Sequence, residues 1–250
     1  MIKVKVSYRS DVGKARKNNE DSVGYFKNKA GIVLGIVADG LGGHQGGEVA
    51  SEMAVSHLGY QFEQTDFYEA QAGLKWLQHV VSAENEVILD KAAQYRDLHG
   101  MGTTLVCVLV FADEFVLANI GDSRGYLLRD GQLLQLSEDH SLVNELVKQG
   151  KISPAEAQSH PQKNIITRTL GISTSAKLEA NIYPSKLNDY LLLCSDGLTN
   201  MVSEAQLQQV LEEAGDLASK CQQLISLANQ AGGLDNITLL LVHLDSEVSS

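Results

Sequence analysis

The most restrictive feature of this 250-residue chain is a set of nearly continuous apolar runs bounded by turn residues such as glycine and aspartate. Examples are "GIVLGIVA" (31–38), "TTLVCVLVF" (103–111) and "YLLLC" (190–194). Strands without polar alternation must be covered on both faces. Turns as short as "RDGQ" (129–132) cannot join parallel neighbours, because a parallel crossover needs roughly a dozen residues or more. The sequence therefore predicts mainly antiparallel sheets that are buried on both faces.

Apolar residues recur at helical spacing in three places, 49–58, 74–92 and 207–228. Two antiparallel sheets packed face to face, with paired helices on the two outer faces, would bury all the apolar runs. We therefore expect an α+β fold, a four-layer α-β-β-α sandwich of two mainly antiparallel sheets flanked by helices. The expected strands lie at about 2–8, 23–27, 32–38, 104–111, 115–120, 125–129, 132–136, 177–183, 190–194 and 237–244.

Length, charge and hydropathy indicate a single-domain protein and argue against nucleic-acid-binding and membrane proteins. The chain fits one domain, which we place at 1–245, followed by a short tail at 246–250. A formal net charge of −11 argues against sequence-independent nucleic-acid binding, which needs a basic surface. The longest apolar stretches fall short of the roughly 20 residues of a membrane span, and no export signal is visible at the start. We expect a cytoplasmic monomer with no membrane or nucleic-acid partner.

Carboxylates stand where the buried strands begin or end. Asp39, Asp122 and Asp196 follow apolar runs, Asp235 precedes one, and Glu20-Asp21 precedes another. Strand ends gathered at one rim of a sandwich would bring these acids together. Like charges a few ångströms apart cannot all stay ionised unless cations neutralise them. Acids clustered in this way predict a metal site.

Asp-Gly pairs also occur simply as turns, because aspartate tolerates tight turns and glycine adopts positive φ. That interpretation suits Asp130-Gly131, which lies between two strand-like segments. It suits "DGLGGHQGG" (39–47) less well, since this segment is longer and richer in glycine than a hairpin needs. The segment "SDGLTN" (195–200) lacks an alternating strand on its far side.

Two nucleophile motifs compete with the metal site. The segment "GDSRG" (121–125) fits the G-x-S-x-G pattern and would make Ser123 a nucleophile, but that motif must lie between a strand and a helix. Here it lies between two predicted strands. Cys194 is not followed by a glycine-rich anion loop that closes on an arginine. We expect it to pack as a small apolar group, like Cys107 and Cys221, in a reducing compartment.

Seven short blocks, taken together, resemble the signature blocks of the metal-dependent PP2C-type (PPM) protein serine/threonine phosphatases in their bacterial single-domain form. The resemblance spans about residues 8–242 and implies the four-layer sandwich, with a flap insertion at about 140–174 beside the metal site. The blocks, in chain order, are "RKNNED" (16–21), "VADGLGGH" (37–44), "GMGTTL" (100–105), "NIGDSRGYL" (119–127), "TRTLG" (167–171), "CSDGL" (194–198) and "DNIT" (235–238).

The resemblance also implies which residues hold metal. Asp39 matches the carboxylate shared by two ions, and the carbonyl of Gly40 matches a further ligand. Asp196 and Asp235 match the remaining direct ligands of one ion. All-oxygen ligand sets of this kind favour Mn²⁺ or Mg²⁺.

Three further acids match residues around the second and third ions. Glu20 and Asp21 match acids that bind the second ion directly or hold its waters. Asp122, together with Asp196, matches a third metal site seen in bacterial members. We therefore expect two core ions and a third.

The family implies direct attack on phosphorus by a water or hydroxide that bridges two metals, without a covalent phosphoenzyme. Arg16 matches the arginine that holds the phosphate, for which a planar donor fork is suited. Many eukaryotic relatives carry a histidine directly after the Asp-Gly pair, where this chain has Leu41. The donor of the leaving-group proton is therefore His44 or, as we favour, a water.

We expect a protein serine/threonine phosphatase, a phosphoric monoester hydrolase acting on phosphorylated proteins and opposing a bacterial serine/threonine kinase. Two alternatives stay open at this point. A catalytically silent interaction domain of the same fold would normally have lost a metal ligand, and here Asp39, Asp196 and Asp235 are all present. A two-metal phosphodiesterase or nuclease would use similar acids, but the charge of −11 disfavours a polyanionic substrate.

Overall fold

The computed structural model describes residues 2–42 and 46–246, and it contains two sheets that pack face to face. All the strand pairs within the sheets are antiparallel. The first sheet has the order β1 (Ile2–Asp11), β11 (Ile237–Ser246), β10 (Tyr190–Cys194), β7 (Arg124–Arg129) and β8 (Gln132–Gln135). The second has the order β2 (Asp21–Lys27), β3 (Val33–Leu41), β5 (Leu105–Val110), β6 (Glu114–Ile120) and β9 (Glu179–Pro184), with β4 (Gly102–Thr103) also paired to β3.

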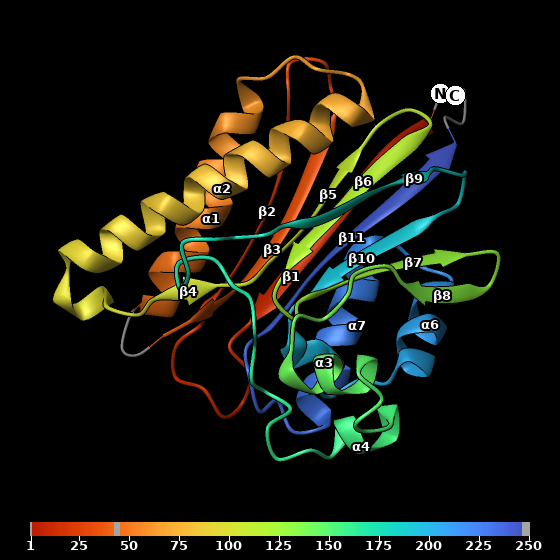
Figure 1. Cartoon of the computed structure of the whole chain (residues 1–250). Coiled ribbons are helices and arrows are strands. Elements are labelled where there is room, and N and C mark those ends of the chain that lie inside the picture. Colours follow the sequence, from red (N-terminus) through yellow and green to blue (C-terminus); the bar gives the residue numbers. More distant parts are fainter. Residues whose placement is uncertain (1, 43–45, 247–250) are drawn as a thin grey trace.

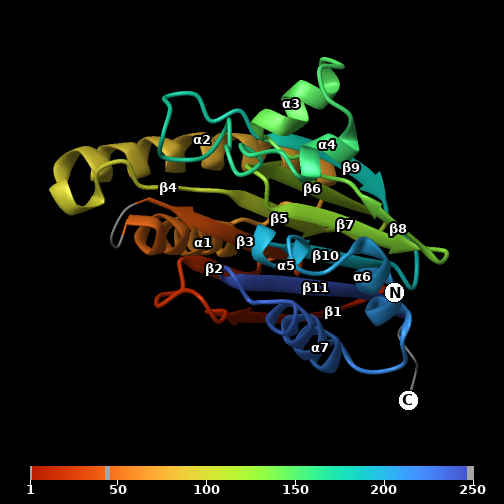
Figure 2. The same ribbon diagram turned by 90° about the horizontal axis from the view of Figure 1, so that it is seen from below.

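Helices cover the outer faces of both sheets (Figures 1 and 2). The helices α1 (Gly46–Glu63) and α2 (Ala70–Gln94) pack on the second sheet, and α6 (Glu204–Glu212) and α7 (Leu217–Gln230) pack on the first. The four-layer α-β-β-α sandwich expected from the sequence is therefore confirmed. A 3-10 turn (Arg96–Leu98) follows α2, and the short helix α5 (Asp196–Thr199) follows β10.

Three apolar clusters explain why the strands lack polar alternation. One lies between the sheets and includes Val37, Val106 and Leu240, which are completely buried. The opposite face of β3 contributes Ile36 to a second cluster beneath α1 and α2, while β10 contributes Leu192 to a third beneath α6 and α7. Each central strand is therefore covered on both faces, as its apolar run requires.

The strand boundaries differ from the expected ones at the acidic end of the sheets. β3 continues through Leu41, so that Asp39 and Gly40 lie within the strand rather than after it. Asp21 is the first residue of β2 instead of preceding it. β4 was not expected, because two residues are too few to show a periodic pattern.

The hairpin between β7 and β8 confirms that Asp130-Gly131 forms a turn. Arg129 pairs with Gln132, and the two residues between them have φ values of 51° and 73°. Positive φ at both central positions is the signature of the two-residue hairpin turn that matches the twist of the strands.

The segment that we expect to form the flap connects β8 to β9 and carries two short helices, α3 (Leu142–Lys148) and α4 (Pro154–Gln158). Ser141 caps α3, and Ser153 forms a reciprocal capping box with Glu156 at the start of α4. The expected tail lies outside the described residues apart from Ser246. Within residues 2–42 and 46–246, no helix is both long enough and apolar enough to cross a bilayer.

Candidate metal centre

Five aspartates that are far apart in the sequence lie near one another, and we call them the aspartate cluster. Asp21 opens β2 and is the register partner of Asp39 in β3. Asp122 lies in the turn between β6 and β7, Asp196 opens α5 two residues after the end of β10, and Asp235 lies two residues before β11. Carboxylates at or near strand ends of both sheets thus lie together at one site.

The pKa values show that these carboxylates act on one another. Burial, and then the charges of Asp21 and Asp196, raise the pKa of Asp39 well above its usual range. Burial raises the pKa of Asp21 to about 7 and that of Asp122 to about 7. Burial and then the charge of Asp235 raise the pKa of Asp196. Such a set of buried like charges is unfavourable unless cations balance it.

The main chain around Asp39 is held by two threonines. The Asp39 amide donates to Thr104 Oγ1 at 2.9 Å, and the Asp39 carbonyl accepts from the Thr103 hydroxyl at 3.0 Å and from the Thr104 amide at 2.9 Å. The Thr104 hydroxyl in turn lies 2.7 Å from Ser123 Oγ. Ser123 is completely buried and has this structural partner, so it does not serve as an exposed hydrolase nucleophile.

Three of the aspartates contact polar side chains. Arg16 Nη2 donates to Asp235 at 2.9 Å, and Asn200 donates to Asp196 at 2.9 Å. The Ser195 hydroxyl donates to Asp21 at 2.7 Å. As the side chains stand, no three His, Cys, Asp or Glu residues in the described ranges converge on a point where one ion could be held. An ion here therefore requires some side chains to turn, with main-chain and solvent oxygens completing its shell.

Glycines leave the space around the site free of side chains. A Cβ at Gly40 would lie 2.1 Å from the Gly47 carbonyl oxygen and 2.5 Å from the Glu20 carbonyl oxygen. A Cβ at Gly47 would lie 2.3 Å from Glu20 Oε2. The Glu20 carboxyl therefore lies against the start of α1, and its burial raises its pKa. The glycine-rich segment after Asp39 is thus required by close backbone approach, not by a hairpin turn.

The donor set fits a hard divalent cation. All the clustered side-chain donors are carboxylate oxygens, which Mn²⁺ and Mg²⁺ prefer. Asp122 Oδ1 is buried and has no hydrogen-bond partner in the described structure. This oxygen is therefore available as a ligand for a cation. The nearby Arg124 does not supply the missing charge, because its guanidinium is bound to Asp139 at 2.6 to 3.0 Å.

The two residues that the sequence suggests for phosphate binding and proton donation, Arg16 and His44, are not among the clustered aspartates. Arg16 is half exposed and reaches the cluster through its ion pair with Asp235. His44 lies outside the described residues, as do its neighbours Gly43 and Gln45.

Sequence reasoning missed three residues that support the site. Asn200 stands four residues after Asp196, a helical spacing that could have revealed it. Arg124 and His140 gave no such signal, because their partners are distant in the sequence. Arg124 binds Asp139, and the His140 ring accepts a hydrogen bond from the amide of Gly121, beside Asp122.

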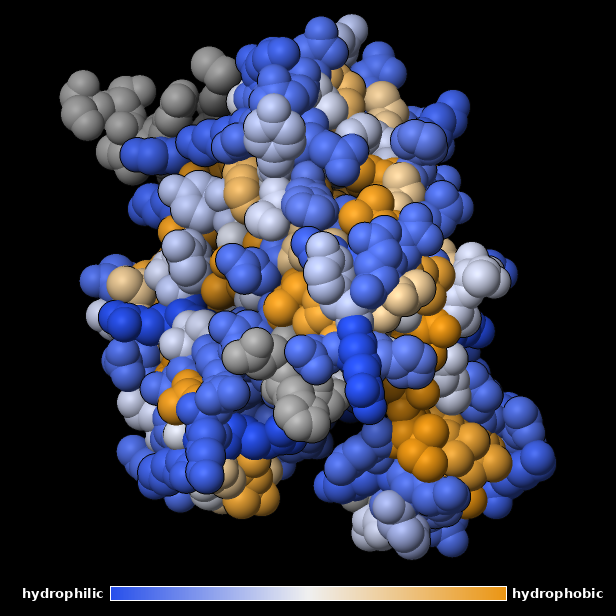
Figure 3. All heavy atoms as spheres, turned by 90° about the vertical axis from the view of Figure 1, so that its left-hand side faces the viewer, coloured by the Kyte–Doolittle hydropathy of each residue, from blue (hydrophilic) through white to orange (hydrophobic). Residues whose placement is uncertain are grey.

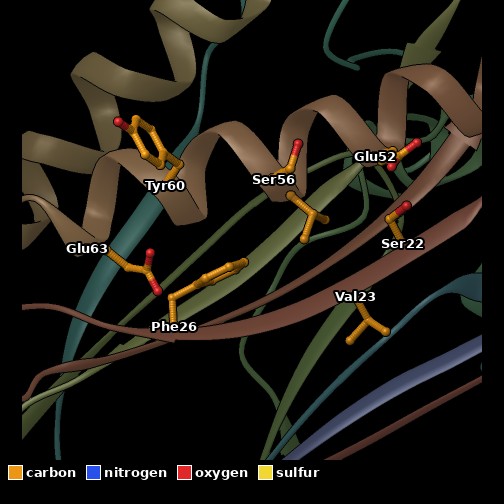
Figure 4. Close-up of a pocket in the computed structure, with 8 residues that line it drawn as sticks. Ser22, Val23, Phe26, Glu52, Ser56, Tyr60 and Glu63 are labelled. Atoms are coloured by element: carbon orange, nitrogen blue, oxygen red, sulfur yellow. The ribbon is translucent and has the colours of Figure 1, made fainter.

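A groove on the second sheet's outer side lies apart from the aspartate cluster. It has a volume of about 310 Å³ and lies between α1 and β2, where Phe26 and Tyr60 project from opposite walls (Figure 4). None of the clustered aspartates lines it, although Ser22 at one end adjoins Asp21. On this side of the molecule, hydrophobic side chains lie in hollows between hydrophilic ones (Figure 3). The aspartates whose pKa values are raised therefore lie outside the lining of this groove.

Comparisons with known proteins match almost the whole chain. Residues 13–233 match the sequence profile of the family described as "Protein phosphatase 2C". The "Serine/threonine phosphatase stp" of Listeria innocua serovar 6a is 46% identical over 236 residues, which cover 94% of each protein.

Two solved structures are close in fold. The serine/threonine phosphatase of S. agalactiae matches with a TM-score of 0.94 at 44% identity, covering 97% of this chain and 100% of that one. The catalytic domain of the serine/threonine protein phosphatase PstP, in complex with two manganese ions, matches with a TM-score of 0.87 at 35% identity. That match covers 98% of this chain and 100% of the other.

Proposed function

The chain belongs to the protein phosphatase 2C family, and from this premise we propose that its aspartate cluster holds the divalent cations of a protein serine/threonine phosphatase. The family resemblance of the sequence blocks is confirmed, and so is the enzyme class, a phosphoric monoester hydrolase that uses Mn²⁺ or Mg²⁺. The observation that carries the assignment of residues is that aspartates from strand ends of both sheets lie close enough to raise one another's pKa.

Each part of the cluster has a proposed role. The ions supply Lewis acidity and lower the pKa of a bridging water that attacks phosphorus. Asp39 would lie between two ions, with the Gly40 carbonyl as a further ligand, and Asp196 and Asp235 would complete one of the two shells. A second set of acids would hold the other ion or its waters: Glu20 and Asp21.

Arg16 is suited to hold the phosphoryl group of the substrate. Its guanidinium already reaches the cluster, where it donates to Asp235 at 2.9 Å. Its side chain is half exposed, so it can turn towards a phosphate without breaking a buried contact. Once a cation binds Asp235, the planar donor fork is free to donate to two phosphoryl oxygens.

Phosphorylated proteins are the substrates, and we further propose that they include a cognate serine/threonine kinase and its targets. We also propose that the protein is cytoplasmic and monomeric. Phosphopeptide profiling in a strain that lacks the gene identifies the substrates, and unchanged phosphorylation of every kinase in that strain would contradict the first of these proposals.

A comparison of ester classes tests the proposed function. With Mn²⁺ we expect rapid hydrolysis of p-nitrophenyl phosphate and of phosphoserine peptides, little hydrolysis of bis(p-nitrophenyl) phosphate, and loss of all turnover in EDTA. The reason is that a monoester presents the free phosphoryl oxygens that cations and Arg16 bind. Preferential cleavage of the bis-ester would indicate a phosphodiesterase instead, and absence of turnover would indicate a silent interaction domain.

The Asp122→Ala variant tests a third cation site, which we propose at Asp122 and Asp196. We expect calorimetry to show that the tighter Mn²⁺ binding events persist while the weakest disappears, and kcat to fall roughly 10- to 100-fold. Asp113→Ala is the matched control, because Asp113 is exposed at the other end of β6. Loss of every binding event in the Asp122 variant would show that the sites are not separate.

A further inference from the structure

His140, at the start of the flap segment, is bonded to the turn that carries Asp122 in two ways. Its main-chain amide donates to the Gly121 carbonyl at 2.9 Å, and its ring Nδ1 accepts from the Gly121 amide at 3.1 Å. Because Gly121 directly precedes Asp122, these bonds fix the peptide on which the Asp122 carboxylate is mounted. The neighbouring Glu138 carbonyl adds a third link, since it accepts from the side chain of Asn119 at 2.8 Å.

The same residue is bonded to the far end of the flap segment. The His140 carbonyl accepts from the Thr167 amide at 2.8 Å, and Ser141 pairs with Ile166 as an isolated antiparallel bridge. The main chain of His140 is therefore hydrogen-bonded to the Asp122 turn on one side and to the returning part of the flap segment on the other.

The returning part of the flap segment then pairs with a residue that contacts Asp39. Leu170 and Thr103 exchange two main-chain hydrogen bonds, at 2.9 and 3.1 Å, and the Thr103 hydroxyl donates to the Asp39 carbonyl. The segment is thus attached near one end to Gly121, which precedes Asp122, and near the other end to Thr103, whose hydroxyl donates to the Asp39 carbonyl. A shift of the segment would therefore act on the main chain beside both aspartates.

The environment of the ring selects one tautomer. His140 is 4% exposed, and burial lowers its pKa, so the ring is neutral. Nδ1 faces a donor, the Gly121 amide, and must therefore be the unprotonated nitrogen. Nε2 then carries the proton and donates to Glu179 at the start of β9, at 3.3 Å. The shorter of the two ring hydrogen bonds is therefore the one that Nδ1 accepts from the Gly121 amide, beside Asp122.

We propose that His140 is a positioning residue for the phosphatase reaction. It couples the flap segment to the Asp122 carboxylate through the hydrogen bond that its Nδ1 accepts from the Gly121 amide. This inference rests on the proposed function, because Asp122 must take part in the site for its position to matter. Among the described residues, Asp122 Oδ1 is buried and has no hydrogen-bond partner, so no side-chain hydrogen bond holds that oxygen. The Gly121–His140 bonds act instead on the main chain of the turn that carries it.

Two substitutions at one position separate the acceptor bond from the rest of the side chain. Asparagine places its Oδ1 where histidine has Nδ1 and can still accept from the Gly121 amide. Glutamine places its polar group where histidine has Nε2, near Glu179, and leaves the Gly121 amide without a partner. We expect His140→Gln to lower kcat about tenfold at saturating Mn²⁺ with little change in KM, and His140→Asn to restore most of that loss.

A double-mutant cycle with Asp122→Ala distinguishes positioning from a general structural role. In the Asp122→Ala background His140→Gln should change kcat less than twofold, because the group through which it acts is gone. Glu179→Gln is the control for the other ring nitrogen and should leave kcat near that of the wild type. Urea midpoints for all variants show whether a loss of kcat follows a loss of stability, and His140→Ala replaces His140→Gln if the latter does not fold.

The outcomes are separable from the proposed function. Mn²⁺-dependent hydrolysis of the monoester by the wild type tests that function by itself. With the wild type active, equal losses for His140→Asn and His140→Gln would overturn the positioning role, and so would losses that add fully to that of Asp122→Ala. Rescue by asparagine and a non-additive cycle are the results that the geometry predicts.

Discussion

Replacing Asp39 with asparagine should abolish Mn²⁺-dependent turnover and, in the metal-free protein, raise the melting temperature. Asp39 is partly buried, and its pKa is raised by burial and by the neighbouring carboxylates. An amide of the same shape can keep the backbone bonds to Thr103 and Thr104 but cannot balance a divalent cation. Loss of a shared ligand removes several kcal/mol of charge stabilisation in the transition state, which corresponds to a fall in kcat of about 10³-fold or more.

The expected gain in stability has the same cause as the loss of activity. Without metal, Asp39 contributes desolvation and like-charge repulsion to the folded state, and asparagine removes both. Mn²⁺ should therefore stabilise the wild type strongly in a thermal melt and the variant only weakly. Differential scanning calorimetry with EDTA and with Mn²⁺, together with kcat on the monoester, measures both effects.

Asp130→Asn is the matched control for this prediction. Asp130 belongs to the same dipeptide, Asp-Gly, but it is exposed in the β7–β8 hairpin with a φ of 51°, which asparagine adopts readily. We expect it to leave kcat, the metal-free melting temperature and the Mn²⁺ response unchanged. An active Asp39→Asn enzyme, or one that Mn²⁺ still stabilises as it does the wild type, would contradict the assigned role of Asp39.

The sequence predicts those parts of the structure that depend on residues close together in the chain. Apolar runs such as 103–111 specify strands covered on both faces, and short turns exclude parallel neighbours, so the layers follow from pattern alone. The acids could also be anticipated, because Asp122 and Asp196 stand at the ends of such runs. The place of a residue at the end of a strand follows from where the apolar run ends. The positions of these acids in the sequence therefore indicate that they lie at the rim of the sheets.

The parts that could not be predicted depend on partners brought together by folding. Thr104 binds the amide of Asp39, 65 residues away, and although Thr104 lies in the block "GMGTTL", the block does not reveal which residue it contacts. His140 contacts Gly121 and Thr167 through bonds that exist only once the flap segment has closed on the β6–β7 turn. Residues that ligate are recognisable by type, whereas residues that orient them are recognisable only by contact.

Replacing Gly40 with alanine is expected to impair both the fold and the site, without removing any ligand atom. The added Cβ would lie 2.1 Å from the Gly47 carbonyl oxygen and 2.5 Å from that of Glu20. Both neighbours are backbone atoms, so relief requires β3, the start of α1 or the Glu20 peptide to shift. We expect a loss of about 3 kcal/mol in the free energy of unfolding. Displacement of Glu20 and Gly47 by about 1 Å would lower kcat about 10²-fold.

Gly46→Ala separates this steric effect from a general intolerance of the glycine-rich segment. A Cβ at Gly46 would lie 3.0 Å from the Met101 Cβ, and its next neighbour is the Met101 Cα at 3.5 Å. Met101 must give by only a few tenths of an ångström, a smaller shift than the backbone clash at Gly40 requires, and alanine favours the first turn of α1. We therefore expect Gly46→Ala to change the urea midpoint and kcat only slightly. If Gly40→Ala were as active and as stable as Gly46→Ala, close backbone approach at Gly40 could not be the reason for the glycine that follows Asp39.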